Sequence, residues 1–389
     1  MNMMTTAALF FLAAGIFTSV TILSAYQILF TLPLIYFTYI AFKNKEFKLP
    51  LSAWFLLAFT AVALLSLIVN YDLIPKPSKN FGRLKYFIFG IGGIFVLRAW
   101  LESATDQTKK IILNTFFLSI VVAGLFSIYQ CFFLGVKRAE GLTETMRYGY
   151  GAGMAITLIL GAHFHRHKLG KWFDYPWAIL ALAFGSMGMY LTFTRGALLG
   201  FICALPVIMY FFKRKLGVLL GLLAILGIIG LGTIYFFGTE KYKSRYLSNK
   251  DNSSDIKRRS QWKAAIIATQ EKPILGWGLS NFHSQLARIK EQYDLEAKQY
   301  NDAHSHNIFL EVASGTGLIG LFFFSGWIFF WAWESYRGDP LTRALIIPFG
   351  VALVVSSQFE VTFDANNASM IFALYAFSKM SLVNLKNET

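Results

Sequence analysis

Apolar runs about as long as a membrane-spanning helix recur along almost the whole chain, and this pattern constrains the fold more than any other feature of the sequence. A helix needs about 20 mostly apolar residues to cross a bilayer, and by that criterion we expect twelve spans. They cover approximately residues 5–22, 25–42, 50–69, 82–100, 111–134, 150–164, 175–193, 196–212, 217–237, 307–333, 342–362 and 367–384. The sequence therefore predicts an all-α fold, a polytopic transmembrane helical bundle.

The composition is that of a membrane protein. Hydrophobic residues make up 56% of the 389 residues and charged residues only 15%, and phenylalanine alone occurs 39 times. Such a chain would be insoluble unless much of it faced lipid. The apolar runs follow one another too evenly for separate soluble cores, so we expect one membrane domain. The first residues lack the positively charged region of a secretory signal, so we expect the first helix to be retained.

The distribution of basic residues predicts the orientation. If the amino terminus is cytoplasmic, every inner loop is basic, whereas the short outer loops are mixed in charge. By the positive-inside rule this favours both termini inside and an even number of spans. The only long polar stretch, about 238–305, then lies outside between the ninth and tenth spans. The chain divides accordingly into spans 1–9 (1–237), an external loop (238–305) and spans 10–12 (306–389).

The external loop carries twelve Lys and Arg residues against eight Asp and Glu. A basic surface beside the bilayer suits an anionic lipid-linked ligand, but an ordinary solvated domain of mixed charge explains the count equally well. Apolar residues recur at three- and four-residue spacing in Asp255–Glu271 and Leu279–Tyr300. We therefore expect the loop to be helical and to lie partly on the membrane.

Arg195 is the first candidate for chemistry, because ionisable residues at membrane depth are costly and often functional. It lies where an outward-going span meets an inward-going one with almost no loop between them. A guanidinium beside the start of a helix makes an anion site, and Arg suits bidentate contact with phosphate better than Lys. On position alone, an interfacial arginine that reaches toward water is the more common explanation.

Arg258 is the second candidate. It is four residues before Trp262, so a cation and an interfacial aromatic share one helix face. The next residue, Arg259, points about a hundred degrees away and is expected to be the solvated member of the pair. A basic amphipathic helix that grips anionic headgroups remains an open alternative.

His304 and His306 form the third candidate, at the outer mouth of the tenth span. Together with Asp302 and Asn307 they have ligand types suited to zinc, but two histidines do not make a site, so no metal is expected. A histidine is the natural group to take a hydroxyl proton near neutral pH. For an isolated external histidine, a structural role as a hydrogen-bonding cap is the simpler interpretation.

Weaker signals and exclusions complete the list. Arg147 precedes the sixth span on the outer side, and Asp364, at the outer end of the eleventh, is suited either to orienting a base or to capping a helix. The glycine spacing in the turn Gly276–Gly278 does not match a phosphate-binding loop.

Other site types are excluded. Cys131 and Cys203 lie inside apolar runs, which excludes a disulfide framework and a thiolate metal site. No nucleophile elbow, Walker loop or Asp-rich metal motif occurs, which disfavours hydrolase, ATPase and metal-dependent transferase functions.

The motifs, taken in chain order, resemble those of the O-antigen ligase family. They are Thr194-Arg-Gly-Ala, Arg258-x-x-x-Trp262, Pro273-x-x-Gly-x-Gly278, His304-Ser-His-Asn307 and Gly315-x-Gly-x-x-Gly-Leu321. The resemblance covers about residues 190–380, and upstream only the span count and Arg147-Tyr-Gly-Tyr-Gly151 agree. The wider group also contains O-antigen polymerases and protein O-oligosaccharyltransferases.

The resemblance implies a glycosyltransferase-C-like enzyme of the bacterial inner membrane, with its active site in the periplasmic loop region. It implies transfer of a glycan from undecaprenyl pyrophosphate to a lipid A core sugar, without a cofactor, a metal or a nucleotide sugar. Arg195 and Arg258 would hold the pyrophosphate and His306 would be the catalytic histidine. Possible supporting residues are Arg259, His304, Asn307, Arg147 and Asp364. Attack by a hydroxyl in one displacement predicts inversion, since no carboxylate nucleophile is evident.

Three other functions stay open. A polymerase would transfer the glycan to another lipid-linked glycan, and an oligosaccharyltransferase would transfer it to a Ser or Thr of a protein. A lipid-linked sugar transporter or flippase would show internal repeats and charges near the midplane, whereas here the charges gather at the outer rim. In each case the expected partners are a lipid-linked glycan and membrane lipids, with no nucleic acid.

Overall fold

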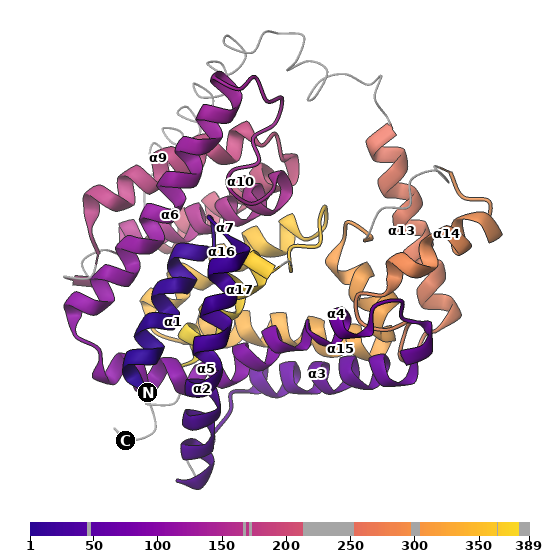
Figure 1. The fold of residues 1–389 in the computed structure, drawn as a ribbon, viewed down its shortest axis with the longest axis horizontal. Coiled ribbons are helices and arrows are strands. Elements are labelled where there is room, and N and C mark those ends of the chain that lie inside the picture. Colours follow the sequence, from indigo (N-terminus) through magenta and orange to yellow (C-terminus); the bar gives the residue numbers. More distant parts are fainter. Residues whose placement is uncertain are drawn as a thin grey trace.

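The computed structural model describes residues 1–44, 48–165, 169–170, 173–212, 253–296, 304–363 and 365–380. Within these ranges the regular structure is entirely helical, which confirms the predicted helical class (Figure 1). The amino-terminal helices are α1 (Asn2–Gly15), α2 (Val20–Lys43), α3 (Leu51–Val69), α4 (Pro77–Phe81), α5 (Leu84–Ser103) and α6 (Asp106–Phe132). The middle and carboxyl-terminal helices are α7 (Thr145–Phe164), α9 (Tyr175–Leu191), α10 (Arg195–Phe212), α13 (Ser253–Glu271), α14 (Phe282–Gln292), α15 (Ile308–Arg337), α16 (Pro340–Ser356) and α17 (Ala365–Met380).

Several of these helices have the length and composition of membrane spans. Among the described residues, five segments qualify, namely α2, α3, the α4–α5 segment Pro77–Ser103, α6 and α15. The helices α1, α9, α10 and α16 are apolar but shorter. The protein is therefore a multi-pass helical membrane protein. Eleven of the twelve predicted segments each overlap one of the described helices, whereas the ninth, 217–237, lies outside the described residues. The count of twelve and the external position of the long loop stay predictions.

Several helix boundaries differ from the sequence prediction near the outer ends: α1 ends at Gly15 instead of 22, and α2 begins at Val20 instead of 25. Helix α7 begins at Thr145 instead of 150, so Arg147 lies in its first turn. Helix α16 ends at Ser356 instead of 362, because the next carbonyl, that of Ser357, accepts a hydrogen bond from the backbone of Ile308. Residues 357–363 therefore form an irregular connection that touches the start of α15.

The bundle core is built on aromatic rings and close helix contacts. Trp327 of α15 is fully buried and stacks on Phe372 of α17 and on Trp331, at ring-centroid distances of 5.3 and 5.6 Å. Helices α6 and α9 pack closely because Gly124 leaves no side chain at their contact. A Cβ atom there would lie 2.3 Å from the carbonyl oxygen of Phe184. Small residues at such contacts are typical of membrane helix packing.

The two glycine-containing motifs of the carboxyl-terminal half pack against each other. The backbone of Trp277 and Gly278 donates to the carbonyls of Ser314 and Gly315, at 2.9 and 2.8 Å. Helix α15 is broken at Gly317, whose φ of 70° favours glycine. A Cβ atom at Gly317 would lie 2.1 Å from the carbonyl oxygen of Ile274. The Pro273–Gly278 turn therefore packs against the break in α15 and restrains the first turns of that helix.

Helices α13 and α14 form a small subdomain beside the start of α15 (Figure 1). Their contact buries Ala264, Ala265, Ala268, Phe282, Leu286 and Ile289. The prediction of helices within the long loop is confirmed for Ser253–Glu271 and Phe282–Gln292.

Candidate active site

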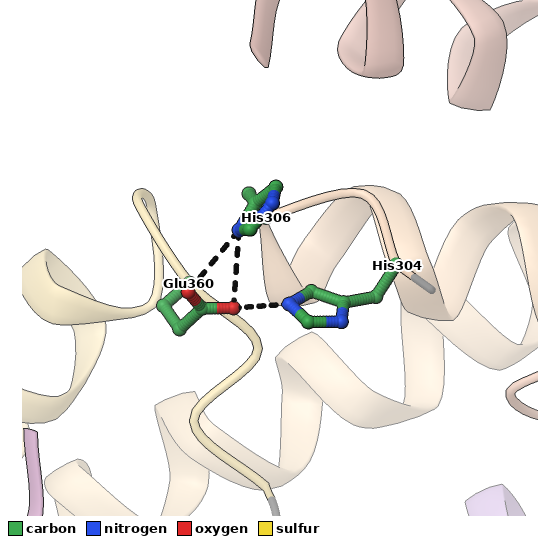
Figure 2. A group of neighbouring side chains, drawn as sticks. All are labelled: His304, His306 and Glu360. Atoms are coloured by element: carbon green, nitrogen blue, oxygen red, sulfur yellow. Dashed lines mark hydrogen bonds and ion pairs between the residues drawn. The ribbon is translucent and has the colours of Figure 1, made fainter. Parts of the chain in front are cut away.

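Two histidines and a glutamate meet where two connections converge (Figure 2). His304 and His306 lie in the segment that leads into α15, and Glu360 lies between α16 and α17. Nδ1 of His306 is 3.1 and 3.2 Å from the two carboxylate oxygens of Glu360. Nε2 of His304 hydrogen-bonds to the same carboxylate. The two imidazole rings are 4.5 Å apart between centroids.

Asn307 fixes the two connections relative to each other. Its side-chain oxygen caps α15 by accepting from the backbone of Phe309 and Leu310, at 2.9 and 3.2 Å. Its amide nitrogen donates to the side-chain oxygen of Gln358 at 3.1 Å. Because Gln358 is two residues before Glu360, this contact sets the distance between the histidines and the carboxylate.

The backbone of the histidine segment is held from the opposite side by Glu311. The carboxylate of Glu311 accepts from the backbone N–H of Ser305 at 3.0 Å, and both residues are buried. His306 has a φ of 53°, in the left-handed region that non-glycine residues seldom occupy. Such strain persists where surrounding contacts impose it, often at active sites. Here it turns the His306 ring toward Glu360.

The site is electrostatically coupled. Glu360 is only 5% exposed, and burial alone would raise the pKa of its carboxyl. The hydrogen bonds and charges of His304 and His306 outweigh burial and hold that pKa well below its usual range. Burial likewise opposes the charged form of His304, but the hydrogen bond and charge of Glu360 raise the pKa of that imidazole. The pair therefore favours an ionised Glu360 beside a protonated His304.

The arrangement suits proton transfer by His306. When Nδ1 of His306 donates to the carboxylate of Glu360, Nε2 keeps its lone pair and is free to accept a proton. A carboxylate that fixes the tautomer and stabilises the imidazolium is the arrangement that makes histidine an effective general base. The His306–Glu360 pair thus has the geometry of an oriented base.

The same three residues also have the spacing of a metal-binding group. Their ligand atoms all lie within 4.8 Å of one another. The sequence argument against a metal counted only two histidines, and Glu360 supplies the third ligand that it lacked. Two imidazole nitrogens and a carboxylate oxygen are donors that zinc accepts. The geometry therefore allows either an oriented base or a metal ligand set.

A cavity of about 590 Å³ opens in front of the cluster. Its volume lies in the range of small-molecule sites. Its lining includes the three cluster residues, and the other charged or hydrogen-bonding side chains on its wall are Lys76, Lys79, Asn80, Arg83, Glu144, Arg147, Tyr150, Ser280, His283, Glu311, Thr362 and Asn367.

Tyr150 connects this cavity to the arginines that the sequence singled out. Its hydroxyl lies within electrostatic range of Glu360, Arg258, Arg138 and Arg195. The phenol also packs on the residue after Arg195, since a Cβ atom at Gly196 would lie 2.4 Å from the Tyr150 oxygen. Charges from α10, α13 and the α6–α7 connection therefore act on one buried tyrosine that lines the cavity.

The predicted residues have different environments. Arg195 is exposed and is the first residue of α10, whereas on α13 Arg258 is half-buried and Arg259 is exposed. Arg147 lines the cavity and pairs with Glu144 at 3.5 Å. Asp302 and Asp364 lie outside the described residues.

Sequence reasoning missed Glu360, Tyr150 and Arg138. Glu360 is the only carboxylate in the apolar run 341–363, and the cost of a charge at membrane depth, which drew attention to Arg195, applies to it equally. It was overlooked because the predicted eleventh span extended to 362 and enclosed it. Tyr150 is part of the motif Arg147-Tyr-Gly-Tyr-Gly151, but its sequence context is that of an ordinary interfacial aromatic. Arg138 was counted only as one of the charges in an outer loop of mixed charge.

Comparison with known families agrees with the motif order. The family described as O-antigen ligase matches residues 180–325, a segment that contains Arg195, Arg258 and His306. This match supports the resemblance to the O-antigen ligase family that the motifs predict. Glu360 and Tyr150 lie outside the matched segment. No curated protein matches the chain.

Proposed function

We propose that this protein transfers a glycan from undecaprenyl pyrophosphate to a sugar hydroxyl of the lipid A core, on the periplasmic face of the bacterial inner membrane. The observation that carries the proposal is the hydrogen bond between His306 and Glu360 at a cavity that is also lined by Tyr150, whose hydroxyl lies within electrostatic range of Arg195 and Arg258. A base and a concentration of positive charge are the two requirements of this reaction.

The arginines serve the leaving group. When the bond between the anomeric carbon and the phosphate breaks, negative charge grows on the pyrophosphate. Arg195 and Arg258 stabilise that charge with forked N–H donors, and no acidic metal site is needed for the purpose. The match to the O-antigen ligase family model supports a lipid-linked glycan as donor.

His306 serves the acceptor. Its Nε2 takes the hydroxyl proton as the oxygen attacks the anomeric carbon, and Glu360 stabilises the resulting imidazolium. The bond to the pyrophosphate breaks as the new glycosidic bond forms on the opposite face, so the configuration inverts. His304 is a supporting residue that shares the carboxylate, and Asn307 and Glu311 position the segment.

Orientation of the site rests on charge distribution. The basic loops of the sequence support an orientation with both termini in the cytoplasm, in which the residues before α15 lie on the periplasmic side. The proposed donor carries its glycan on that side, so the cavity and its substrate meet in the same compartment.

The test is an in vitro transfer assay with purified protein, undecaprenyl-pyrophosphate glycan and lipid A core in EDTA. Wild type is expected to form the glycosylated product, whereas His306→Ala, Arg195→Ala and Arg258→Ala lose transfer while retaining the wild-type elution profile in detergent. Arg259→Ala is the matched comparison, since it removes the same group from the neighbouring, exposed position.

The outcomes separate the alternatives. Elongation of the lipid-linked glycan, or labelling of a protein, would move the function to a polymerase or an oligosaccharyltransferase. Movement of the lipid-linked glycan across vesicles without a new glycosidic bond would support a flippase. Wild-type levels of product from His306→Ala would refute the assignment of the base.

A further inference from the structure

The cavity has a second basic wall that the proposed reaction does not use. Lys76, Lys79 and Arg83 come from α4 and the residues on either side of it, and all three line the cavity. Lys76 and Lys79 are exposed, and Arg83 is half-buried. This basic wall is separate in sequence from the arginines around Tyr150.

The charges on this wall are not neutralised by the acids of the cavity. Each of the three cavity glutamates has another partner: Glu144 pairs with Arg147, Glu311 accepts from Ser305, and Glu360 binds the two histidines. Within the described part of the chain, no ion pair involves Lys76, Lys79 or Arg83. The wall therefore presents positive charge that an anionic ligand can take.

The wall is held in place by the glycine-containing turn. The side chain of Asn80 donates to the carbonyl of Leu279 at 2.7 Å, and Nη1 of Arg83 donates to the Ser280 hydroxyl at 2.8 Å. Asn281 donates back to the carbonyl of Leu73 at 3.2 Å. Because the turn itself packs against α15, the α4 backbone and the Arg83 guanidinium are fixed relative to the histidines, and a preorganised group loses less entropy on binding.

The wall and the arginines have different neighbours at the site. Arg83 lies within electrostatic range of His304, whereas Arg195 and Arg258 lie within range of Tyr150. In an inverting displacement the acceptor oxygen approaches opposite the departing pyrophosphate. A second anion that binds beside His304 therefore belongs to the acceptor.

We propose that Lys76, Lys79 and Arg83 bind a phosphate group on the acceptor glycan, so that the substrate class is a phosphorylated oligosaccharide. This inference rests on the proposed function. The Arg83 guanidinium supplies a planar fork that matches phosphate oxygens, and the two lysines add mobile point charges at the mouth of the cavity. The phosphate positions the acceptor and takes no part in bond making.

The experiment compares acceptors with and without phosphate. Steady-state KM values are measured for lipid A core in its phosphorylated form and after chemical dephosphorylation, with the donor saturating. The variants are Lys76→Gln/Lys79→Gln and Arg83→Gln. Lys85→Gln is the matched control, because Lys85 is a neighbouring cation that does not line the cavity and lies over the ring of Tyr86.

The wild type is expected to bind the phosphorylated acceptor more tightly than the dephosphorylated one. Each variant raises KM for the phosphorylated acceptor by roughly tenfold, the effect of losing one charge-assisted hydrogen bond. KM for the dephosphorylated acceptor and KM for the donor stay unchanged, and Lys85→Gln behaves as wild type. The double lysine variant alters only exposed side chains, so it tests the proposal even if Arg83→Gln does not fold.

Three results overturn the inference. Equal wild-type KM values for both acceptors would show that phosphate is not recognised. Equal losses by the variants on both acceptors would show a structural role for the wall, and a raised donor KM would assign it to the donor. Failure of the proposed function is distinct, because wild type would then transfer glycan to neither form of the acceptor.

Discussion

The carboxylate of Glu360 lies 3.1 Å from Nδ1 of His306, although the two residues are separated by the whole of α15 and α16. This contact places a buried negative charge behind the imidazole that faces the cavity. The role of His306 as a base depends on it, because the carboxylate decides which ring nitrogen carries the proton.

Glu360→Gln is expected to lower kcat with little change in KM. The amide keeps the size of the side chain but loses the charge that stabilises the imidazolium. Loss of a hydrogen bond between charged groups costs about 1.5–3 kcal/mol, which corresponds to about a 10- to 150-fold fall in rate. Initial-rate kinetics at several pH values measure the effect.

A second variant separates positioning from folding. Glu360→Asp keeps the charge and is expected to recover part of kcat, whereas a merely structural residue would tolerate Gln better than the shorter Asp. Wild-type kcat and an unchanged pH profile in Glu360→Gln would contradict the role of Glu360.

The His304–Glu360 pair predicts a pH window for stability. The raised pKa of His304 means that its contribution is complete below its ordinary value of 6.5 and is lost as the pH rises through the raised value. The lowered pKa of Glu360 means that its contribution is present above 4.5 and is lost as the pH falls through the lowered value. The pair is therefore fully formed between these two ordinary values.

Thermal unfolding in detergent at a series of pH values checks this window. The difference in Tm between wild type and His304→Gln is expected to be largest near the acidic side of neutrality and to shrink as the pH rises above 6.5 toward and through the raised pKa of His304. A difference that grows with pH over the same range would contradict the assigned ion pair.

Tyr150→Phe is expected to reduce transfer without unfolding the protein. Tyr150 lines the cavity and its buried hydroxyl lies within electrostatic range of Arg195 and Arg258, where we expect it to donate a hydrogen bond to a phosphate oxygen of the donor. Removing a donor of this kind from a developing anion typically costs about 10²–10³ in kcat.

Tyr148→Phe provides a matched control for Tyr150→Phe. Tyr148 is two residues away on the same helix and equally buried, but it does not line the cavity. It packs on Gly188 and lies near Ser127 within the bundle. Equal effects of the two substitutions on kcat and on Tm would show that Tyr150 acts through packing alone.

Hydropathy was enough to find the long apolar helices that the structure describes, because the cost of an exposed polar backbone in lipid imposes long apolar runs on any spanning segment. It was not enough to place their ends. The end of α16 depends on a hydrogen bond from Ile308 to Ser357, a contact between residues 49 positions apart. No local pattern carries that information, so Glu360 was enclosed in a predicted span.

The residues of the candidate site also fall into two groups, those that the sequence predicts and those that only the structure reveals. Arg195, Arg258 and His306 were found because an unusual residue type stood at a membrane boundary in a recognisable order. Tyr150 could be recognised as a candidate only from the structure, in which charges of α10 and α13 come within electrostatic range of this residue of α7. Side chains that act by convergence of distant helices leave only a weak local signal.

Zinc is expected to inhibit transfer although the proposed reaction needs no metal. His304, His306 and Glu360 have ligand atoms within 4.8 Å of one another. Zinc bound by these residues would take the Nδ1 lone pair of His306, replace the hydrogen bond between Nδ1 and Glu360, and keep the ring proton on Nε2, which could then no longer accept one. Initial rates with added zinc, and again after EDTA, measure the effect.

His304→Gln should weaken zinc inhibition, because it removes one of the three ligands while His306 keeps its carboxylate. Activation by zinc, or permanent loss of activity in EDTA, would instead identify a metal-dependent enzyme and refute the metal-independent mechanism.

The opposite end of α15 holds a buried ion pair that predicts stability and not activity. Nζ of Lys379 lies 2.9 Å from Glu334, and the lysine side chain is fully buried. The same carboxylate accepts from the backbone and hydroxyl of Ser52, at 2.9 and 2.6 Å, so α3, α15 and α17 are joined at one point. Lys379→Met leaves Glu334 buried without its counter-ion, which typically costs about 3–5 kcal/mol, whereas Lys379→Met/Glu334→Gln removes both charges and is expected to recover most of the loss. Tm measured in detergent tests this order of stability, in which the double variant is more stable than Lys379→Met alone.

Lys110→Met is the control. Lys110 pairs with Asp174 at 3.0 Å but is 45% exposed, so its loss is expected to cost no more than about 1 kcal/mol. If the double variant were less stable than Lys379→Met alone, the remaining polar contacts of Glu334, and not the pairing of charges, would hold these helices together.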